Sequence, residues 1–178
     1  GYQEGSPPSQ KTGFNPTVWP ATCKESCAKE SRSAKKKKDM SDVNGHKGHC
    51  RCGGVEMLAR GEIVLSVYCH CDDCRRAVGA PVLASVGFRR DNIDWRSDES
   101  LKRHTVGTAT RLFCGECGTP VAQEHESVAD CVFFNTGFMD NPQDFPPTHH
   151  TFAGHQLPWL ELNDDLPRVD KTLLIKAN

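Results

Sequence analysis

Two short cysteine motifs, Cys-Arg-Cys at residues 50–52 and Cys-Gly-Glu-Cys at residues 114–117, decide the fold of this chain. Each pair is too close in sequence to form a comfortable disulfide, but each can present two thiolates to one ion. Four thiolates at ~2.3 Å make a closed tetrahedral zinc site. Because 61 residues separate the pairs, the ion would join distant strands. The motifs therefore predict a structural zinc site formed by Cys50, Cys52, Cys114 and Cys117, although free core thiols or two disulfides would give the same pattern.

A second group of three cysteines lies within residues 68–76, which read Tyr-Cys-His-Cys-Asp-Asp-Cys-Arg-Arg. Three protein ligands with an open fourth position are typical of a catalytic zinc site. A thiol bound at the open position loses its proton near neutral pH and becomes a nucleophile. We therefore expect a catalytic zinc ion on Cys69, Cys71 and Cys74. The alternative is a second closed site, completed by His70, Asp73 or Cys131.

Alternation along the preceding segment bears on that alternative. Residues 63–70 alternate with a period of two, which indicates a strand whose successive side chains point to opposite faces. His70 would then point away from the sulfurs on either side of it. Arg75 and Arg76 follow at the start of a short helix and could hold an acidic substrate. Asp72 and Asp73 are expected to cap that helix.

From about Gly45, short apolar runs alternate with Gly, Pro, Asn and Asp, which predicts an all-β domain of many short strands. The one helical segment is Asp73–Val78. Trp159 is expected in the core. A core of modest size for ~130 residues would gain stability from metal crosslinks. Strands are predicted at residues 63–70, 82–88, 110–113, 120–123 and 131–138.

Composition divides the 178 residues into two parts. Residues 1–39 hold eight basic and four acidic residues, and the remainder holds 14 basic and 19 acidic residues, a net charge of −5. The first part is rich in Ser, Pro and Lys and poor in large apolar residues, so we expect residues 1–44 to be a basic, disordered tail or upstream segment. The folded zinc-binding domain is expected over 45–178. The tail also contains Cys23 and Cys27, which are not expected to bind metal.

The same numbers exclude several classes of protein. Lys plus Arg is 22 and Asp plus Glu is 23, so the whole molecule is not expected to bind nucleic acid. No run approaches the ~18 apolar residues of a membrane span. Ten cysteines without a secretory signal point to metal rather than disulfides and to the cytoplasm.

Five segments in order resemble the glutathione-dependent formaldehyde-activating enzyme family, also called the CENP-V/GFA domain family. They are GHCRCGGV, YCHCDDCRRAVGAP, TRLFCGECGTPV, FNTGFMDNPQDFPPTHHTF and LPWLELNDDLP, and together they span roughly residues 48–168. The resemblance implies a mostly β, Mss4-like fold of short antiparallel strands organised around zinc. It also assigns the first four cysteines to a structural zinc site and the other three to a catalytic-type site.

The resemblance further implies a carbon–sulfur lyase that interconverts S-hydroxymethylglutathione with glutathione and formaldehyde. His150 lies at a family-matched position and is the acid/base candidate, and Arg76 matches the segment after the third ligand. Glutathione is the expected partner, and the oligomeric state is left open. Alternatives are an enzyme of this fold that acts on another thiol adduct or an imine, and a non-catalytic zinc-binding interaction module of the CENP-V type.

Overall fold

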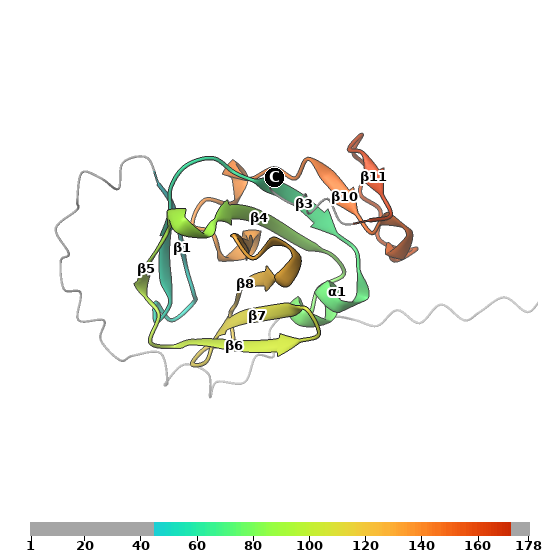
Figure 1. Ribbon diagram of the computed structural model, residues 1–178. Coiled ribbons are helices and arrows are strands. Elements are labelled where there is room, and N and C mark those ends of the chain that lie inside the picture. Colours follow the sequence, from blue (N-terminus) through green and yellow to red (C-terminus); the bar gives the residue numbers. More distant parts are fainter. Residues whose placement is uncertain (1–44, 172–178) are drawn as a thin grey trace, which may run out of the picture. The chain divides into compact units, whose positions relative to one another are not determined.

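The structure is a computed structural model that describes residues 45–171 (Figure 1). The segment 1–44, which was predicted to be a basic tail, lies outside the described residues, and so do residues 172–178. Among the described residues, no helix is sufficiently long and apolar to cross a membrane.

Strands dominate the described part of the chain, as the alternation of short apolar runs predicted. Residues 45–171 contain one α-helix, α1 (Asp72–Val78), and five short 3-10 helices: η3 (Arg90–Asn92), η4 (Glu126–Val128), η5 (Thr136–Phe138), η6 (Pro142–Asp144) and η7 (Ala153–His155). The strands are β1 (His46–His49), β2 (Glu56–Ala59), β3 (Leu65–Cys69), β4 (Leu83–Arg89), β5 (Ile93–Ser97), β6 (Leu101–Val106), β7 (Ala109–Cys114), β8 (Pro120–His125), β9 (Cys131–Asn135), β10 (His149–Thr151) and β11 (Arg168–Val169).

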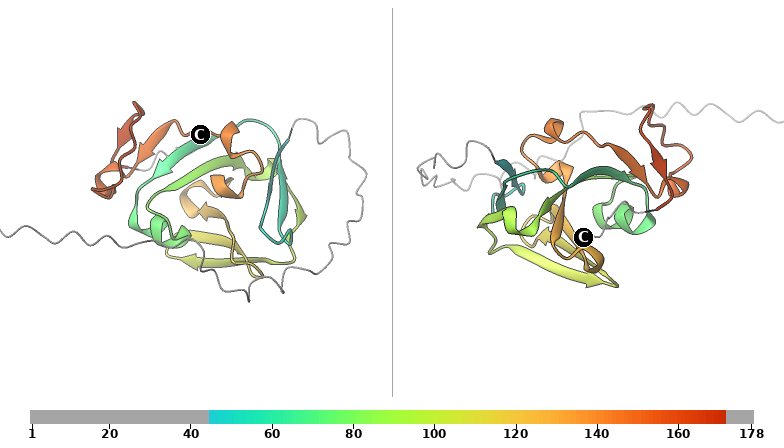
Figure 2. Two further views of the ribbon diagram at one scale, coloured as in Figure 1. Left: turned by 180° about the vertical axis from the view of Figure 1, so that it is seen from behind. Right: turned by 45° about the horizontal axis from the view of Figure 1, so that its top comes forward.

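The strands form two sheets. The smaller sheet has the order β1-β2-β5, and the larger has the order β11-β10-β3-β4-β9-β8-β7-β6. Pairing is antiparallel except at one edge, where β10 runs parallel to both β3 and β11. Figure 2 shows β10 and β11 following β3 along that edge. The larger sheet thus brings β3, which ends at Cys69, and the β7–β8 hairpin, which carries Cys114 and Cys117, into one structure.

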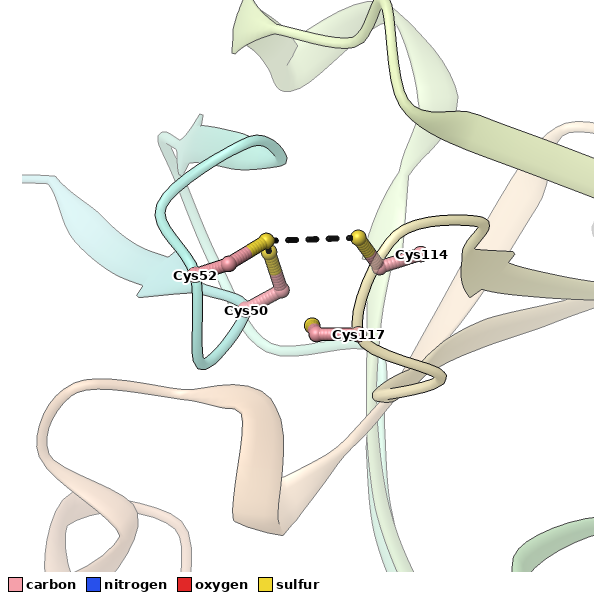
Figure 3. Close-up of side chains that lie close together, drawn as sticks. All are labelled: Cys50, Cys52, Cys114 and Cys117. Carbon is pink, nitrogen blue, oxygen red and sulfur yellow. Dashed lines mark hydrogen bonds between the residues drawn. The ribbon is translucent and has the colours of Figure 1, made fainter. Parts of the chain in front are cut away.

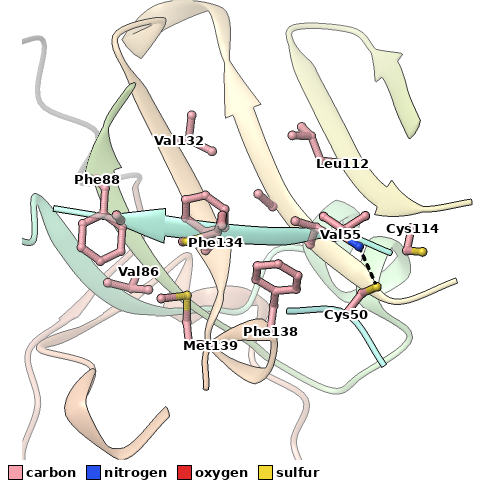
Figure 4. Packing of buried hydrophobic residues seen from close by; sticks show 14 of the residues in the cluster. Cys50, Val55, Val86, Phe88, Leu112, Cys114, Val132, Phe134, Phe138 and Met139 are labelled. Carbon is pink, nitrogen blue, oxygen red and sulfur yellow. Dashed lines mark hydrogen bonds between the residues drawn. The ribbon is translucent and has the colours of Figure 1, made fainter. Parts of the chain in front are cut away.

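The hydrophobic core packs one face of the larger sheet against the smaller sheet (Figure 4). Alternate residues of β4, β7 and β9 point into it, and their side chains are almost fully buried because side chains on a strand alternate between faces. The core side chains drawn from these three strands are Val86, Phe88, Leu112, Val132 and Phe134. Cys50 and Cys114 belong to the same cluster, so the first predicted metal site lies at the margin of the main core.

The ends of the predicted elements differ from the structure in instructive ways. The sequence predicts one strand over residues 131–138, but β9 ends at Asn135 and the 3-10 helix η5 follows. The prediction that Trp159 packs in the core is wrong, because the residue is 69% exposed. The expected Asp cap of α1 is also wrong, since the N-cap is Cys71, whose Sγ accepts a hydrogen bond from the Cys74 backbone N–H.

Candidate metal centre

Each pair of the first cysteine group lies in a hairpin turn. Cys50 and Cys52 follow β1 and precede β2, whereas Cys114 ends β7 and Cys117 lies in the turn before β8. The four sulfur atoms all lie within 4.8 Å of one another. Figure 3 shows the four side chains directed toward one another from the two turns. An ion held here would join a hairpin of the smaller sheet to a hairpin of the larger one.

The spacing of these sulfurs fits zinc. Cys50 Sγ lies 3.5 Å from Cys52 Sγ, and Cys52 Sγ lies 3.6 Å from Cys114 Sγ. Four sulfurs placed tetrahedrally ~2.3 Å from zinc are about 3.8 Å apart. The backbone N–H of Val55 points at Cys50 Sγ over 3.3 Å, the kind of hydrogen bond that supports a thiolate ligand. The donor set and its spacing therefore suit a closed, structural zinc site.

Glycines allow both turns to close tightly around their sulfurs. Gly53 has φ +76° and Gly118 has φ +70°, a left-handed conformation that costs other residues energy. The Gly53 N–H donates to the Cys50 carbonyl, and the Gly118 N–H donates to the Cys114 carbonyl, each over 2.9 Å. These turns fix the two cysteines of each pair on the same side of the hairpin.

The second cysteine group lies where β3 meets α1. Cys69 ends β3, Cys71 is the N-cap of α1 and Cys74 lies in its first turn, so a strand end and a helix start supply the three sulfurs. All three lie within 4.8 Å of one another, and Cys69 Sγ is 3.5 Å from Cys71 Sγ. Among residues 45–171, no fourth histidine, cysteine or carboxylate donor joins this group.

These three thiols share their protons unequally. Hydrogen bonds from the S–H groups of Cys69 and Cys74 lower the pKa of the Cys71 thiol to about 2, with help from the Cys74 backbone N–H and the charge of Arg111. The same contacts with Cys69 and Cys71, together with burial, raise the pKa of Cys74. One thiolate is thus stabilised before any cation is added, which suits a cation-binding group.

Arg111 on β7 lies directly beside this group. Its Nη2 atom is 3.7 Å from Cys74 Sγ, and the guanidinium also donates to the Asp73 carboxylate and to Gln123 Oε1. The sequence left open whether Arg111 pairs locally or binds a substrate carboxylate. In the structure its N–H groups donate hydrogen bonds to Cys74, Asp73 and Gln123. This arrangement places one positive charge beside the group of three cysteine sulfurs.

His70 points to the opposite face of β3 from the flanking sulfurs, as the alternation predicted. Its Nε2 atom lies 2.8 Å from Nδ1 of His150 on the neighbouring strand β10, and His150 Nε2 lies 2.9 Å from the Asp164 carboxylate. Both rings are fully buried. Burial, followed by the charges of His150 and two arginines, lowers the pKa of His70 to about 4. His70 therefore stays neutral, and the network orders the strand behind the sulfurs.

His150 and Arg76, the two catalytic candidates predicted from the sequence, do not line the cavity beside Cys69, Cys71 and Cys74. His150 is buried between His70 and Asp164. Arg76 has a side chain that is 79% exposed, and its Nε donates to Asp72 one helical turn earlier over 2.7 Å. This pair holds the first turn of α1.

A cavity of about 420 Å³ opens beside the three sulfurs. It lies on the face of the larger sheet opposite the main core, because alternate residues of β3 and β7 point into it. In β7 and β8 these residues form two cross-strand pairs, Ala109 with His125 and Arg111 with Gln123. Phe133 on β9 and Phe152 before η7 complete the wall.

The sequence did not identify Gln123, His125 or Phe152 as parts of this site. A signal for the first two was present, because they occupy alternate positions of the strand that follows the second cysteine pair. Such a period indicates a shared face but does not say which face carries the site. Phe152 carries no such signal, since its place depends on the turn into η7.

Comparison with known proteins gave one family and one structural similarity of note. The model of the family described as "Glutathione-dependent formaldehyde-activating enzyme" matches residues 45–155. The chain is also similar to a Rhodobacter sphaeroides protein of known crystal structure, with 29% sequence identity and a TM-score of 0.45. The alignment covers 55% of this chain and 93% of the Rhodobacter chain. No curated protein sequence matches the chain. The match spans both cysteine groups and more than half of the chain, and so the chain belongs to the glutathione-dependent formaldehyde-activating enzyme (GFA) family.

Proposed function

We propose that this protein is a zinc-dependent carbon–sulfur lyase that interconverts S-hydroxymethylglutathione with glutathione and formaldehyde. The observation that carries the proposal is the incomplete ligand set: three cysteine sulfurs, with no fourth donor among residues 45–171, form part of the wall of a cavity large enough for a small molecule. A closed site of the kind seen at Cys50 would leave no position for a substrate.

The donor set fits zinc at this second group as well. Thiolates are soft ligands that select zinc over hard cations such as magnesium or calcium. When bound, zinc would supply the positive charge that keeps a substrate thiol deprotonated near neutral pH. Cys69, Cys71 and Cys74 would hold the ion, and their three negative charges suit it to binding a thiol rather than to strong Lewis-acid hydrolysis.

The reaction needs little else from the chain. In the direction of synthesis, the sulfur of glutathione forms a bond to the carbonyl carbon, and the carbonyl oxygen becomes a hydroxyl group. The thiol loses one proton and the hydroxyl group gains one, and water can carry that proton from sulfur to oxygen. No atom is oxidised or reduced. Cleavage is the reverse. The cavity walls supplied by Leu65 and Phe152 reduce the access of water to the reacting atoms.

Three polar residues take positioning roles in this proposal. Arg111 offsets the negative charge of the cluster at Cys74. His150 holds His70 and, through it, the strand end that carries Cys69. Arg76 ties the first turn of α1 to Asp72. None of these assignments requires His150 or Arg76 to contact the substrate.

The test is the rate of exchange between glutathione and formaldehyde, measured by NMR exchange spectroscopy with the zinc-loaded protein. We expect exchange faster than the spontaneous reaction, with a rate that saturates as glutathione is raised. Boiled protein and free zinc at the same concentration are the controls. A rate equal to that of the controls would exclude the proposed reaction.

Arg111 gives a separate prediction about metal affinity. Arg111→Gln is expected to weaken zinc binding at the second group about 10–100-fold, because it removes the guanidinium N–H groups that donate to the ligand sulfur of Cys74. Competition with a chromophoric chelator measures this. Arg103→Gln, on the neighbouring strand β6, removes the same charge from a side chain that pairs with Glu124 rather than with a sulfur, and it should leave the affinity unaltered. Equal affinities for both variants would remove Arg111 from the site.

A further inference from the structure

The cavity beside the three sulfurs is larger and more apolar than an adduct of formaldehyde requires. Formaldehyde contributes one carbon atom to the adduct, whereas the cavity holds about 420 Å³, the size of a pocket for a small organic molecule. Much of its wall is apolar, from β3, the β6–β7 turn, β9 and the segment before η7. The apolar side chains are Leu65, Val67, Val106, Ala109, Phe133 and Phe152.

The charged groups in this wall already have partners. Arg111 donates to Asp73, and Glu124 accepts from Arg90 over 2.8 Å. His125 bonds to Thr108 and Ser127 through its two ring nitrogens. No cation of the described wall is therefore left to hold a substrate carboxylate. Burying the two carboxylates of glutathione against this wall would cost free energy without compensation.

Phe152 shows that the fold maintains this wall under strain. Its φ of +52° lies in the left-handed region, and it is the one non-glycine residue with positive φ among residues 45–171. Its ring packs against the small cluster of Cys69, Cys74 and Leu83, so it connects the apolar wall directly to the sulfurs. Strained residues persist where the surrounding structure holds them, and such places are frequently ligand sites.

From these observations we infer that the cavity accepts the aldehyde half of the adduct, and that this half carries an apolar chain of several carbons. The inference rests on the proposed function, because it places the carbon–sulfur bond at the three sulfurs. The substrate is then a hemithioacetal, R–S–CH(OH)–R′, in which R is glutathione and R′ is apolar. Cleavage breaks the carbon–sulfur bond, the hydroxyl proton returns to the sulfur, and the products are the thiol and the aldehyde R′CHO.

Stable thioethers separate this inference from the reaction itself. S-methylglutathione mimics the formaldehyde adduct, and S-hexylglutathione mimics the adduct of a six-carbon aldehyde. We expect S-hexylglutathione to bind the zinc-loaded full chain at least about 30-fold more tightly in calorimetry, because each further buried CH₂ group raises affinity several-fold. The measurement does not depend on turnover.

A pair of variants locates the effect in the cavity. Ala109→Phe fills the cavity from β7 and should abolish the preference for the hexyl compound. Thr110→Phe places the same aromatic side chain at the next residue of β7, whose side chain points to the opposite face of the sheet. It should preserve the preference for the hexyl compound. Melting temperatures of both variants establish that they are folded.

The outcomes distinguish the two proposals. Equal binding of the methyl and hexyl compounds, binding of neither, or a preference that survives in Ala109→Phe would overturn the inference about the apolar chain. Accelerated exchange of formaldehyde alongside any of these results would leave the lyase proposal standing. A clear hexyl preference without accelerated exchange of formaldehyde would keep the apolar cavity and exclude the proposed reaction with formaldehyde.

Discussion

Replacing Cys114 with serine is expected to unfold most of the protein at room temperature. Cys114 is fully buried in the main core and belongs to the four-sulfur group that joins the β1–β2 and β7–β8 hairpins. A structural zinc site contributes about 10–16 kcal/mol of apparent binding free energy, comparable with or above the ~5–15 kcal/mol net stability of a typical domain. Loss of one ligand therefore removes more stability than the modest core can replace.

Cys131→Ser is the matched control for this experiment. Cys131 is also buried and carries a free thiol, but it belongs to neither sulfur group. We expect it to cost about 1–3 kcal/mol, because a hydroxyl is placed in an apolar strand. Urea denaturation followed by circular dichroism, with zinc content per chain, compares the two. A Cys114→Ser protein with the urea midpoint of the Cys131→Ser control would contradict the structural role.

The second large effect is expected at the other sulfur group, and it concerns activity rather than stability. Cys71→Ala removes the N-cap sulfur that links Cys69 to the first turn of α1. We expect a folded protein that holds one zinc ion instead of two and exchanges glutathione with formaldehyde roughly 100-fold more slowly or worse, because a lost ligand costs more than a lost supporting contact.

Metal content and folding must be measured on the same Cys71→Ala sample. Cys131→Ala changes a buried thiol outside both groups and should keep two zinc ions and full exchange activity. Unchanged turnover in a folded Cys71→Ala protein with one zinc ion would remove this group from the mechanism. A variant that fails to fold would instead assign the second group a structural role.

The sequence predicted the sulfur groups well because ligand spacing is a local property. The C-x-C and C-x2-C pairs fall in hairpin turns, and alternation along residues 63–70 placed Cys69 and His70 on opposite faces. Both follow from the period of a strand, which needs no knowledge of distant contacts. The alternation of short apolar runs predicted the mainly β fold, and the family resemblance added the Mss4-like fold organised around zinc.

The cavity and the contact between Arg111 and Cys74 could not be predicted from the sequence, because both depend on contacts between distant elements. The cavity exists because β3, β7 and β8 share one sheet, and strand order is not encoded in local periodicity. The same is true of the contact between Arg111 and Cys74, which joins residues 37 positions apart. Trp159 was misplaced because an aromatic residue after proline suggests burial, yet this one lies exposed on the chain after η7.

The histidine pair behind β3 has a practical consequence for where the protein can be shortened. Asp164, whose carboxylate holds His150, lies beyond residue 155, where the family match ends. A fragment that stops at 155 would retain all seven sulfur ligands but lose both Asp164 and β11, the neighbour of β10. Recombinant versions for metal analysis or crystallisation should therefore extend through Val169, even though recognition of the family requires none of those last residues.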